Sequence, residues 1–321
     1  MSPRHVPLVS ALVVNWNGKR YLAECLQSLR AQAYPRLEVV VVDNGSADGS
    51  VALVEGQYPE VHLLALGENR GFSGGVNAGA KVAQGEVLAL LNNDAVARPD
   101  WAAALVDALE RHAEAGMAAS KMLLYDRPTV INAAGDIFRT DGIPGNRGVW
   151  QEDRGQYDCE EWVFGGCGGA VAYRRAMWQA LGGFDERFFM YCEDVDLNWR
   201  AQLAGFRCIY TPQAVVRHRL SATGGGATAS FYTGRNTLWV LAKDLPGSLW
   251  RQYGPRIWRA QGRIAREALH AWRGEAARAR LRGQLAALVT WPRLWPSRRA
   301  VQGSRVVSDA YLQALLSQAD A

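Results

Sequence analysis

The chain has 321 residues, 49% of them hydrophobic, and carries a formal net charge of +5 at pH 7. This composition excludes a disordered chain, and the length suits one large α/β domain with a smaller extension. The five cysteines form no CxxC pair, so we expect reduced thiols. No apolar stretch reaches the roughly 18–20 residues of a membrane-spanning helix, and residues 1–10 lack the apolar core of a signal peptide. We therefore expect a cytoplasmic protein, soluble or peripheral at the inner face of the cell membrane.

Strands and helices alternate along the first third of the chain. Short runs rich in Val and Leu predict buried parallel strands over 8–14, 37–43, 61–66 and 86–92. Helices are expected between and after them, over 19–32, from about 46–50, at the end of the Gly-rich segment 69–85, and over 101–116. This order predicts a mostly parallel sheet flanked by helices. Further strands are expected over 168–175 and 207–212, whereas the pattern leaves 125–160 undecided.

Three apolar runs end on acidic or amide residues. The second strand ends at Asp43, the fourth runs into Asn92-Asn93-Asp94, and Glu193-Asp194 open a predicted helix. The carboxyl ends of parallel strands meet at one edge of the sheet, where ligands bind. Carboxylates gathered there suit a metal-bound diphosphate and a general base beside it.

The sequence lacks the common nucleotide-binding fingerprints. The first strand is followed by NWNGKR (15–20), which has one glycine where GxGxxG would stand, and no GxxxxGK[ST] loop occurs. The segment GFSGGVNAG (71–79) follows Asn69 and Arg70 and predicts a loop that lets a ligand approach the backbone near a helix N-terminus. A tight helix entry is the alternative interpretation.

The sequence resembles the family-2 glycosyltransferases of GT-A fold, and among them the bacterial rhamnosyltransferase-like enzymes of cell-surface polysaccharide synthesis. The resemblance spans about residues 8–245, in the family's order. Its segments are VVNWNG (13–18), VVDNGSADGS (41–50), NRGFSGGVNAGAK (69–81), LLNNDA (90–95), the long run 182–208 around CEDVD, and FYTGRNTLWVLAKDLP (231–246). One departure is Asn92, which stands where the family's DxD motif often has Asp, so the metal site rests on fewer carboxylates.

The resemblance implies a fold, the Rossmann-like GT-A sheet flanked by helices, and a UDP- or dTDP-sugar donor. Asn15 and Asp43 would bind the nucleoside, while Arg70 and the Gly71–Gly75 turn would hold base and diphosphate. Arg235, with Asn236 beside it on a helix, would reach the diphosphate or the acceptor. The residues implied for donor binding are Asn15, Asp43, Arg70, Gly71, Gly75, Asn77, Asn92, Asn93 and Arg235.

The resemblance also implies a divalent metal, Mg²⁺ or Mn²⁺, held by Asp94 and His218, with the loop 223–230 closing over the donor as a lid. Asp194 matches the family's catalytic base and Glu193 is its neighbour or alternate. Direct displacement by a deprotonated acceptor hydroxyl inverts the anomeric configuration. The segment 164–175 resembles the stretch that shapes the acceptor pocket. Asp196 and Arg200, four residues apart, are expected to form a helix-stabilising pair instead.

The implied activity is inverting transfer of a sugar to a hydroxyl of a saccharide, lipid-linked in this interpretation. A sugar-nucleotide nucleotidyltransferase is one alternative, but it needs a Gly-rich loop with Arg or Lys after the first strand, which NWNGKR fits poorly. A degenerate scaffold that binds without turnover is another, against which the Glu193-Asp194 pair and Asp94 argue. All of this depends on Asp43, Asp94 and Asp194 lining one cavity.

The tail differs from the rest of the chain, and we divide the chain into 1–245 and 246–321 at the Pro-Gly turn. Residues 251–299 hold twelve Arg and two Glu, a local charge of +10, whereas residues 1–250 sum to −4. Five tryptophans, at 250, 258, 272, 291 and 295, lie among these arginines. Arg and Trp on helices suit an anionic membrane surface. The alternative is a helical face that packs its tryptophans on the main domain, and nucleic acid is not an expected partner.

Overall fold

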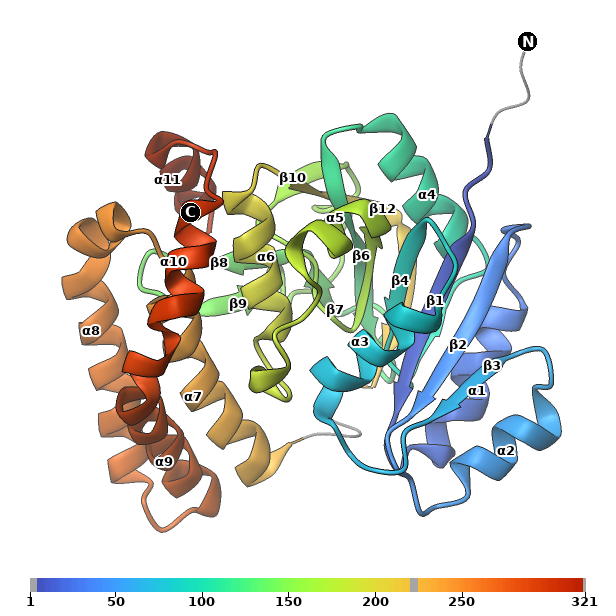
Figure 1. Ribbon diagram of the computed structural model, residues 1–321, viewed down its shortest axis with the longest axis horizontal. Helices are drawn as coiled ribbons and strands as arrows, with labels where there is room; N and C mark the ends of the chain where they lie inside the picture. Colours follow the sequence, from blue (N-terminus) through green and yellow to red (C-terminus); the bar gives the residue numbers. More distant parts are fainter. Residues whose placement is uncertain (1–4, 220–224, 320–321) are drawn as a thin grey trace.

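The computed structural model describes residues 5–219 and 225–319. Its N-terminal part is the predicted parallel sheet (Figure 1), because Val- and Leu-rich runs buried on both sides pair in register: β1 with β2 and β4, and β2 with β3. The bounds are β1 (Val9–Asn15), β2 (Leu37–Asp43), β3 (His62–Ala65) and β4 (Val87–Leu91). All four predicted strands are thus confirmed, each shifted by no more than one residue at either end.

The second half extends the same sheet with mixed directions. β11 (Ala170–Arg174) runs antiparallel between β4 and β6 (Ala115–Leu124), and β12 (Arg207–His218) is parallel to β6. In the described part of the chain the order is β10-β12-β6-β11-β4-β1-β2-β3, with β5 on β12, β7 on β6 and a separate β8–β9 hairpin. These shorter strands are β5 (Ala95–Ala97), β7 (Ile131–Ala134), β8 (Asp136–Phe138), β9 (Pro144–Asn146) and β10 (Glu161–Val163).

The predicted helix over 101–116 is wrong at its end. α4 (Trp101–Arg111) stops early, and β6 begins at Ala115. Ala and Met are strong helix formers and make 115–119 resemble a helix by propensity, but these residues pair with β11 and β12, and this tertiary pairing decides the structure.

Helices cover both faces of the sheet (Figure 1). One core contains side chains of α1 (Lys19–Arg30), α2 (Ser50–Gln57) and α4, and the other contains those of α3 (Gly71–Val82), α5 (Arg175–Leu181) and α6 (Glu193–Leu203). β1 shows why two cores form: Val9, Ala11 and Val13 enter the first core, while Leu12 enters the second.

The C-terminal helices form a layer beside α6 with a third core (Figure 1). They are α7 (Gly226–Asp244), α8 (Gly247–His270), α9 (Glu275–Thr290), α10 (Trp295–Gly303) and α11 (Asp309–Ser317), with short 3₁₀ turns η1 (Glu186–Phe188) and η2 (Trp291–Leu294). α7 and α9 pack at backbone distance through two glycines. A Cβ at Gly283 would lie 2.2 Å from the Phe231 carbonyl oxygen, and one at Gly234 would lie 2.8 Å from that of Arg280.

The tail both packs and exposes its tryptophans. Trp250 and Trp291 are partly buried and lie against Trp258, whereas Trp258, Trp272 and Trp295 keep 48%, 59% and 55% of their surface exposed. Among residues 5–219 and 225–319, no helix is long and apolar enough to span a bilayer. α7 ends and α8 begins where the Pro-Gly turn was predicted. The division into two domains stays a prediction. All five cysteines are free thiols, as expected.

Candidate active site

A row of polar side chains lies at the carboxyl ends of β1, β2 and β4. Asn15 Nδ2 donates to Asp43 Oδ2 at 3.1 Å, and Asn93 Nδ2 donates to Asn15 Oδ1 at 2.8 Å. The backbone N–H of Ser46 donates to Asp43 Oδ1 at 2.8 Å. All three predicted residues are buried, and in the described chain no Lys or Arg forms an ion pair with Asp43. Amides and backbone N–H groups therefore orient these side chains without neutralising the carboxylate.

Arg70 lies at the end of this row, placed by a residue that the sequence reasoning missed. Asn44, next to Asp43, accepts from the backbone N–H of Arg70 at 3.0 Å and donates to the Gly71 carbonyl at 2.9 Å. The Arg70 side chain is half exposed, with Glu68 at 3.7 Å. Asn44 could have been found from the sequence, because it directly follows the strand that ends in VVD (41–43).

The Gly-rich segment corrects the loop prediction, because helix α3 already starts at Gly71. Gly71 has φ +73° and a Cβ there would lie 2.3 Å from the Phe189 carbonyl oxygen; a Cβ at Gly75 would lie 2.7 Å from Val14. Asn77 is bound to the 184–186 segment, donating to the Phe184 carbonyl at 2.9 Å and to Glu186 at 3.0 Å. These glycines thus leave room for neighbouring protein atoms, and the donor contacts of Gly71, Gly75 and Asn77 stay a prediction.

Asp94 and His218 meet across the sheet, as the metal prediction requires. His218 Nε2 lies 3.2 Å from Asp94 Oδ1 and 3.3 Å from Asn92 Nδ2. Its other ring nitrogen, Nδ1, lies 2.8 Å from the Oδ1 of buried Asn132 on β7. With the proton on Nδ1 donated to Asn132, the Nε2 lone pair points toward Asp94 and Asn92. Asn132 lies in the segment 125–160, which the pattern left undecided, so no sequence pattern pointed to this residue.

The donor set suits a divalent metal whose remaining ligands come from elsewhere. A carboxylate and an imidazole with an oriented Nε2 are ordinary ligands for Mn²⁺, and the oxygen is one for Mg²⁺. Within residues 5–219 and 225–319, no group of three His, Cys, Asp or Glu side chains is placed to hold an ion. The protein thus offers two ligands, and diphosphate oxygens and water would have to complete the shell. Residues 223 and 224 of the predicted lid lie outside the described residues, and from Gly226 onward the segment is helix α7.

The acidic pair follows a strained backbone segment. Phe189, Tyr191 and Cys192 have φ of 66°, 66° and 64°, values that non-glycine residues rarely adopt. Such conformations cost on the order of 1 kcal/mol or more each and persist where the surroundings enforce them. α6 begins directly after this segment, at Glu193.

Asp194 and Glu193 point to different surroundings, as adjacent helical residues do. Asp194 Oδ2 accepts from the Gly168 N–H at 2.8 Å, and its Oδ1 accepts from the Val195 N–H at 2.8 Å. Gly168 belongs to the segment 164–175 predicted for the acceptor side. Glu193 is buried, and its Oε2 has no hydrogen-bond partner among the described residues.

Both carboxyls are shifted toward the neutral form. Burial raises the pKa of Asp194, although the N–H groups of Gly168 and Val195 act in the opposite direction. Burial, and then the charge of Asp194, raise the pKa of Glu193 well above its usual value. Tyr191 lies between the acidic groups: burial, Glu193 and Asp94 together raise its pKa. A carboxylate with a raised pKa is a stronger base once ionised, which suits proton removal from a hydroxyl.

Backbone contacts connect Asp194 to the metal-side residues. Asn92 N–H donates to the Gly169 carbonyl at 2.9 Å, and Gly169 follows the Gly168 that binds Asp194. Asn92 also reaches His218, and its neighbour Asn93 reaches Asn15. Asp43, Asp94 and Asp194 therefore lie along one continuous set of contacts. That they line a single ligand cavity stays a prediction.

Arg235 and Asn236 lie on α7 and face the strained segment. Arg235 Nη2 donates to the carbonyls of Arg187 and Phe188 at 2.9 and 3.0 Å. Its guanidinium also lies 4.3 Å from the centre of the Trp239 ring. The side chain is thus committed to neighbouring protein atoms, which gives no support to the predicted contact with the diphosphate. Tyr232, one turn earlier on α7, stacks on Phe189 with ring centres 5.3 Å apart.

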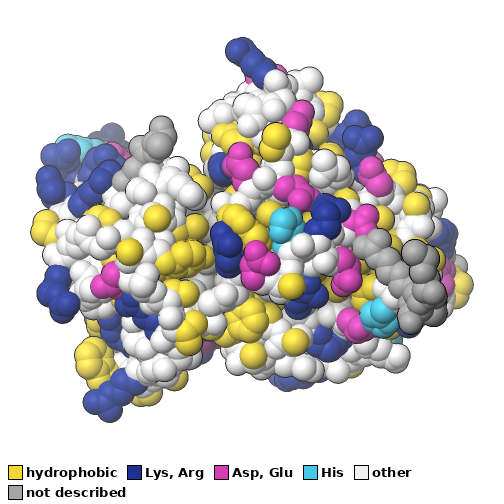
Figure 2. Space-filling model, turned by 90° about the horizontal axis from the view of Figure 1, so that it is seen from above, with side chains coloured by type: hydrophobic (Ala, Val, Ile, Leu, Met, Phe, Trp, Pro, Cys, Tyr) yellow, Lys and Arg dark blue, Asp and Glu magenta, His cyan; other side chains and the backbone are white. Residues whose placement is uncertain are grey.

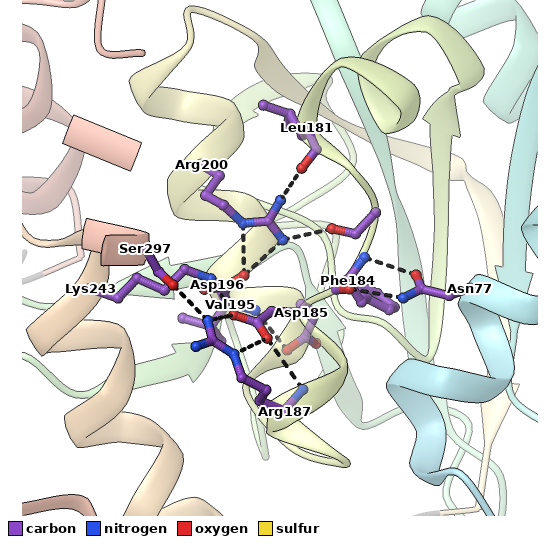
Figure 3. Close-up of polar contacts among 12 residues, drawn as sticks. Asn77, Leu181, Phe184, Asp185, Arg187, Val195, Asp196, Arg200, Lys243 and Ser297 are labelled. Carbon is purple, nitrogen blue, oxygen red and sulfur yellow. Dashed lines mark hydrogen bonds and ion pairs between the residues drawn. The ribbon is translucent and has the colours of Figure 1, made fainter. Parts of the chain in front are cut away.

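A buried ionic network lies behind the acidic pair (Figure 3). Asp196 binds Arg200 at 2.7 Å, which confirms the predicted pair, and Lys243 of α7 at 2.5 Å. Lys243 also binds Asp185 at 2.8 Å, and Asp185 pairs with Arg187. Burial would raise the pKa of Asp196, but Arg200 and Lys243 lower it. The network joins α6, α7 and the η1 turn, so it fixes the helix that carries Asp194.

Solved structures with the same arrangement of elements define the class. GalNAc-T7 crystallised with UDP, GalNAc and Mn²⁺ superposes with a TM-score of 0.62 at 16% identity, covering 75% of this chain and 48% of that one. A mannosyltransferase from Pyrobaculum calidifontis, with GDP-Man and Mn²⁺, gives 0.56 at 18% identity over 98% and 85% of the two chains. The fold is therefore the predicted GT-A glycosyltransferase fold.

Sequence comparison then gives the family. Residues 10–181 match Glycosyl transferase family 2. The N-acetylglucosaminyl-diphospho-decaprenol L-rhamnosyltransferase of Mycobacterium tuberculosis H37Rv is 30% identical over 292 residues, which cover 80% of this chain and 91% of the relative. The O-antigen biosynthesis protein RfbC of Myxococcus xanthus is 33% identical over 68% of this chain and 18% of its own length. The chain belongs to Glycosyl transferase family 2, in the rhamnosyltransferase-like subgroup, and is a glycosyltransferase rather than a nucleotidyltransferase.

Proposed function

We propose that this glycosyltransferase moves a sugar from a UDP- or dTDP-sugar to a hydroxyl of a lipid-linked saccharide, with inversion, at the cytoplasmic face of the membrane. The observation that carries the proposal is the connection of Asp194, through Gly168, Gly169 and Asn92, to the Asp94–His218 pair. Direct displacement needs a base for the acceptor hydroxyl and a site for the leaving diphosphate. In this proposal Asp194 is the base, and the Asp94–His218 pair forms the leaving-group site.

Asp194 is the base in this proposal. Its carboxylate takes the proton of the acceptor hydroxyl while the acceptor oxygen bonds to the anomeric carbon. The bond from that carbon to the diphosphate oxygen breaks, and its electron pair leaves with the nucleoside diphosphate. Attack from the face opposite the leaving group inverts the configuration. Glu193, buried and with a raised pKa, is the alternate base.

Asp94 and His218 would hold Mg²⁺ or Mn²⁺, which neutralises charge on the departing diphosphate. The Mn²⁺ named with both structural neighbours supports a divalent metal for this fold. The row Asn15, Asp43 and Asn93 would hold the nucleoside side of the donor, with Arg70 half exposed at its end. Asn92 would keep His218 turned toward Asp94.

The lipid-linked acceptor draws support from two directions. The M. tuberculosis relative is named for an acceptor on a decaprenyl diphosphate, and the match extends over 91% of its length. In this chain, α8 and α9 carry a surface that fits a membrane. Saccharides attached to polyprenyl lipids are presented at a bilayer, so an enzyme that binds the bilayer meets them there.

Exposed apolar residues on α8 and α9 lie next to the interface between these helices. Gln261 and Gln284 are buried and hydrogen-bonded across that interface at 3.3 Å. Turning the same way from them on the helical wheel come Trp258 and Leu269 on α8, and Leu285 and Leu288 on α9. Trp272 follows in the turn after α8. Since α8 and α9 run antiparallel, the exposed apolar residues of the two helices lie on the same side of the helix pair. We call this set of five residues the apolar stripe.

Arginines border the apolar stripe. Arg259, Arg263 and Arg266 lie on α8 beside it, and Arg273 follows in the turn after that helix. From above, Figure 2 shows the helical end of the molecule, at the left, with far more Lys and Arg than Asp and Glu, and with hydrophobic side chains between them. Apolar side chains flanked by cations suit an anionic bilayer, each cation near the surface contributing about 1 kcal/mol.

Vesicle binding tests the membrane part. The full-length Trp258→Ser, Leu269→Ser, Trp272→Ser variant should lose most co-sedimentation with phosphatidylglycerol-containing vesicles. Trp150→Ser, a change of the same kind at a site 56% exposed on the main domain, should bind like the parent. Equal binding by the triple variant and the parent would remove the apolar stripe from the proposal.

Thermal-shift screening tests the donor part. UDP-, dTDP- and GDP-sugars, each with and without MnCl₂, should separate, because a bound ligand stabilises in proportion to its saturation. We expect the largest shift with a UDP- or dTDP-sugar plus Mn²⁺, followed by release of nucleoside diphosphate when the acceptor is supplied. A chain that binds a donor without releasing nucleoside diphosphate under any condition would be a scaffold instead.

A further inference from the structure

The strained segment before the acidic pair is held by one buried amide. Asn236 is fully buried, and its Nδ2 lies within hydrogen-bond distance of three backbone carbonyls. The distances are 3.0 Å to Phe188, 2.9 Å to Met190 and 2.6 Å to Tyr191. The residues with positive φ, Phe189, Tyr191 and Cys192, lie among or next to these carbonyls. Asn236 thus faces the part of the backbone that is least able to keep its shape alone.

Neighbours on α7 reinforce the same contact. Arg235 Nε donates to Asn236 Oδ1 at 2.8 Å, so the amide orientation is set with Oδ1 as acceptor and Nδ2 toward the carbonyls. The Cys192 thiol lies 3.9 Å from the hydroxyl of Thr237. Three consecutive α7 residues therefore hold the segment that leads into Glu193.

On its other side the segment touches the donor half. The Ser73 N–H, in the first turn of α3, donates to the Phe189 carbonyl at 3.2 Å, and Gly71 leaves room for that carbonyl. The segment therefore connects α3, at the end of the donor row, with α7. Its position sets where α6 starts and hence where the Asp194 carboxylate lies.

We propose that Asn236 is a positioning residue: by gathering the carbonyls of Phe188, Met190 and Tyr191 it fixes the start of α6 and holds Asp194 in place for proton removal. This rests on the proposed role of Asp194. Asn236 touches neither donor nor acceptor in this assignment. It acts on the rate of transfer through the backbone and leaves the donor row unchanged.

The test compares Asn236→Ala with Gln284→Ala, which removes another buried amide of the helical layer, one bonded to Gln261 and remote from the segment. With the donor selected by thermal shift, kcat of Asn236→Ala should fall about 10²-fold, the size of effect that a displacement near 1 Å produces. Its KM for donor and its affinity for UDP or dTDP with Mn²⁺ should stay within about twofold. Gln284→Ala should keep kcat at a comparable loss of Tm.

The pH profile separates positioning from a loss of folding. Relaxation of the segment would admit water to Asp194 and Glu193, so the acid limb of kcat/KM should move to lower pH in Asn236→Ala. Asn236→Asp, which keeps the shape and loses the donor, should show the same loss of kcat if the alanine variant folds poorly. Unchanged kcat in both variants, or equal loss of kcat and donor affinity, would overturn the proposal.

Failure of the proposed function gives a different result. If Asp194→Asn turned over normally, Asp194 would not be the base. In that case, Asn236→Ala would lower kcat without moving the acid limb of the kcat/KM profile. Asn236 would then only shape the acceptor side, and its proposed role toward Asp194 would be overturned.

Discussion

Two groups of aspartates in this protein have opposite surroundings. Asp43 and Asp194 accept hydrogen bonds from amides and backbone N–H groups, with no Lys or Arg paired to them in the described chain. Asp185 and Asp196, in the network of Figure 3, are neutralised by Arg187, Arg200 and Lys243. The first group has carboxyl oxygens that no cation of the protein neutralises, whereas the carboxylates of the second group join helices through ion pairs.

The largest expected effect is that of Asp194→Asn, which removes a carboxylate of the first group. Loss of the base should lower kcat by about 10³-fold, within the usual range for a general base, while donor affinity is retained. Because burial raises the Asp194 pKa, folding disfavours the charged form of this side chain, so replacing it with a neutral amide should not lower Tm. Steady-state kinetics and donor calorimetry measure the two effects. Glu193→Gln is the control, and a larger loss there would make Glu193 the base.

Removing a cation from the second group should act on stability instead. Lys243→Met leaves Asp185 and Asp196 short of a buried partner, which costs about 3 kcal/mol. Denaturant unfolding measures the loss, and donor affinity at low temperature should be that of the parent. Arg305→Met, which breaks the more exposed pair with Asp309, should cost less than about 1 kcal/mol. Equal costs in the two variants would contradict the distinction drawn between the groups.

The metal-side residues give a third, smaller effect. Asn132→Ala removes the acceptor for His218 Nδ1, and such losses typically weaken metal binding about 10–100-fold. Titration of Mn²⁺ in the presence of the donor nucleotide measures this. Gln313→Ala, which removes an amide bonded to Gln252 of α8, is the control and should leave the Mn²⁺ titration unchanged. Unaltered metal affinity in Asn132→Ala would mean that His218 is not a ligand.

The smallest effect is on pH dependence, and its sign differs between the groups. Asp194 has a raised pKa, so kcat/KM should fall on acidification at a pH above the ordinary Asp value near 3.9. Its contribution to stability is present at low pH and is lost as pH rises through the raised pKa. Asp185 has a lowered pKa despite burial, because Arg187 and Lys243 favour its charge. Its contribution is present above about pH 4 and is lost as pH falls further.

Sequence pattern predicted where the strand-end residues lie in the fold, and their roles stay a prediction. Asp43, Asn93 and Asp94 follow buried strands, and strand order alone brings such ends together. The pattern could not separate a Gly-rich ligand loop from a helix start that needs room for Phe189, because both favour glycine. Nor could it find Asn132, which lies in a short strand of irregular composition. The three carbonyls that Asn236 contacts lie 45 or more residues away in the chain, which no local pattern encodes.

The two glycines between α7 and α9 have a consequence for anyone who shortens this protein. Gly234 and Gly283 let the backbones of α7 and α9 come into contact. The residues after 245 therefore provide much of the surface on which α7 packs. A chain truncated at the Pro-Gly turn would expose leucines of α7 to solvent and destabilise the helix that carries Asn236. Single-residue changes on the outer surface, with the C-terminal helices intact, are therefore the sound way to probe what the tail does.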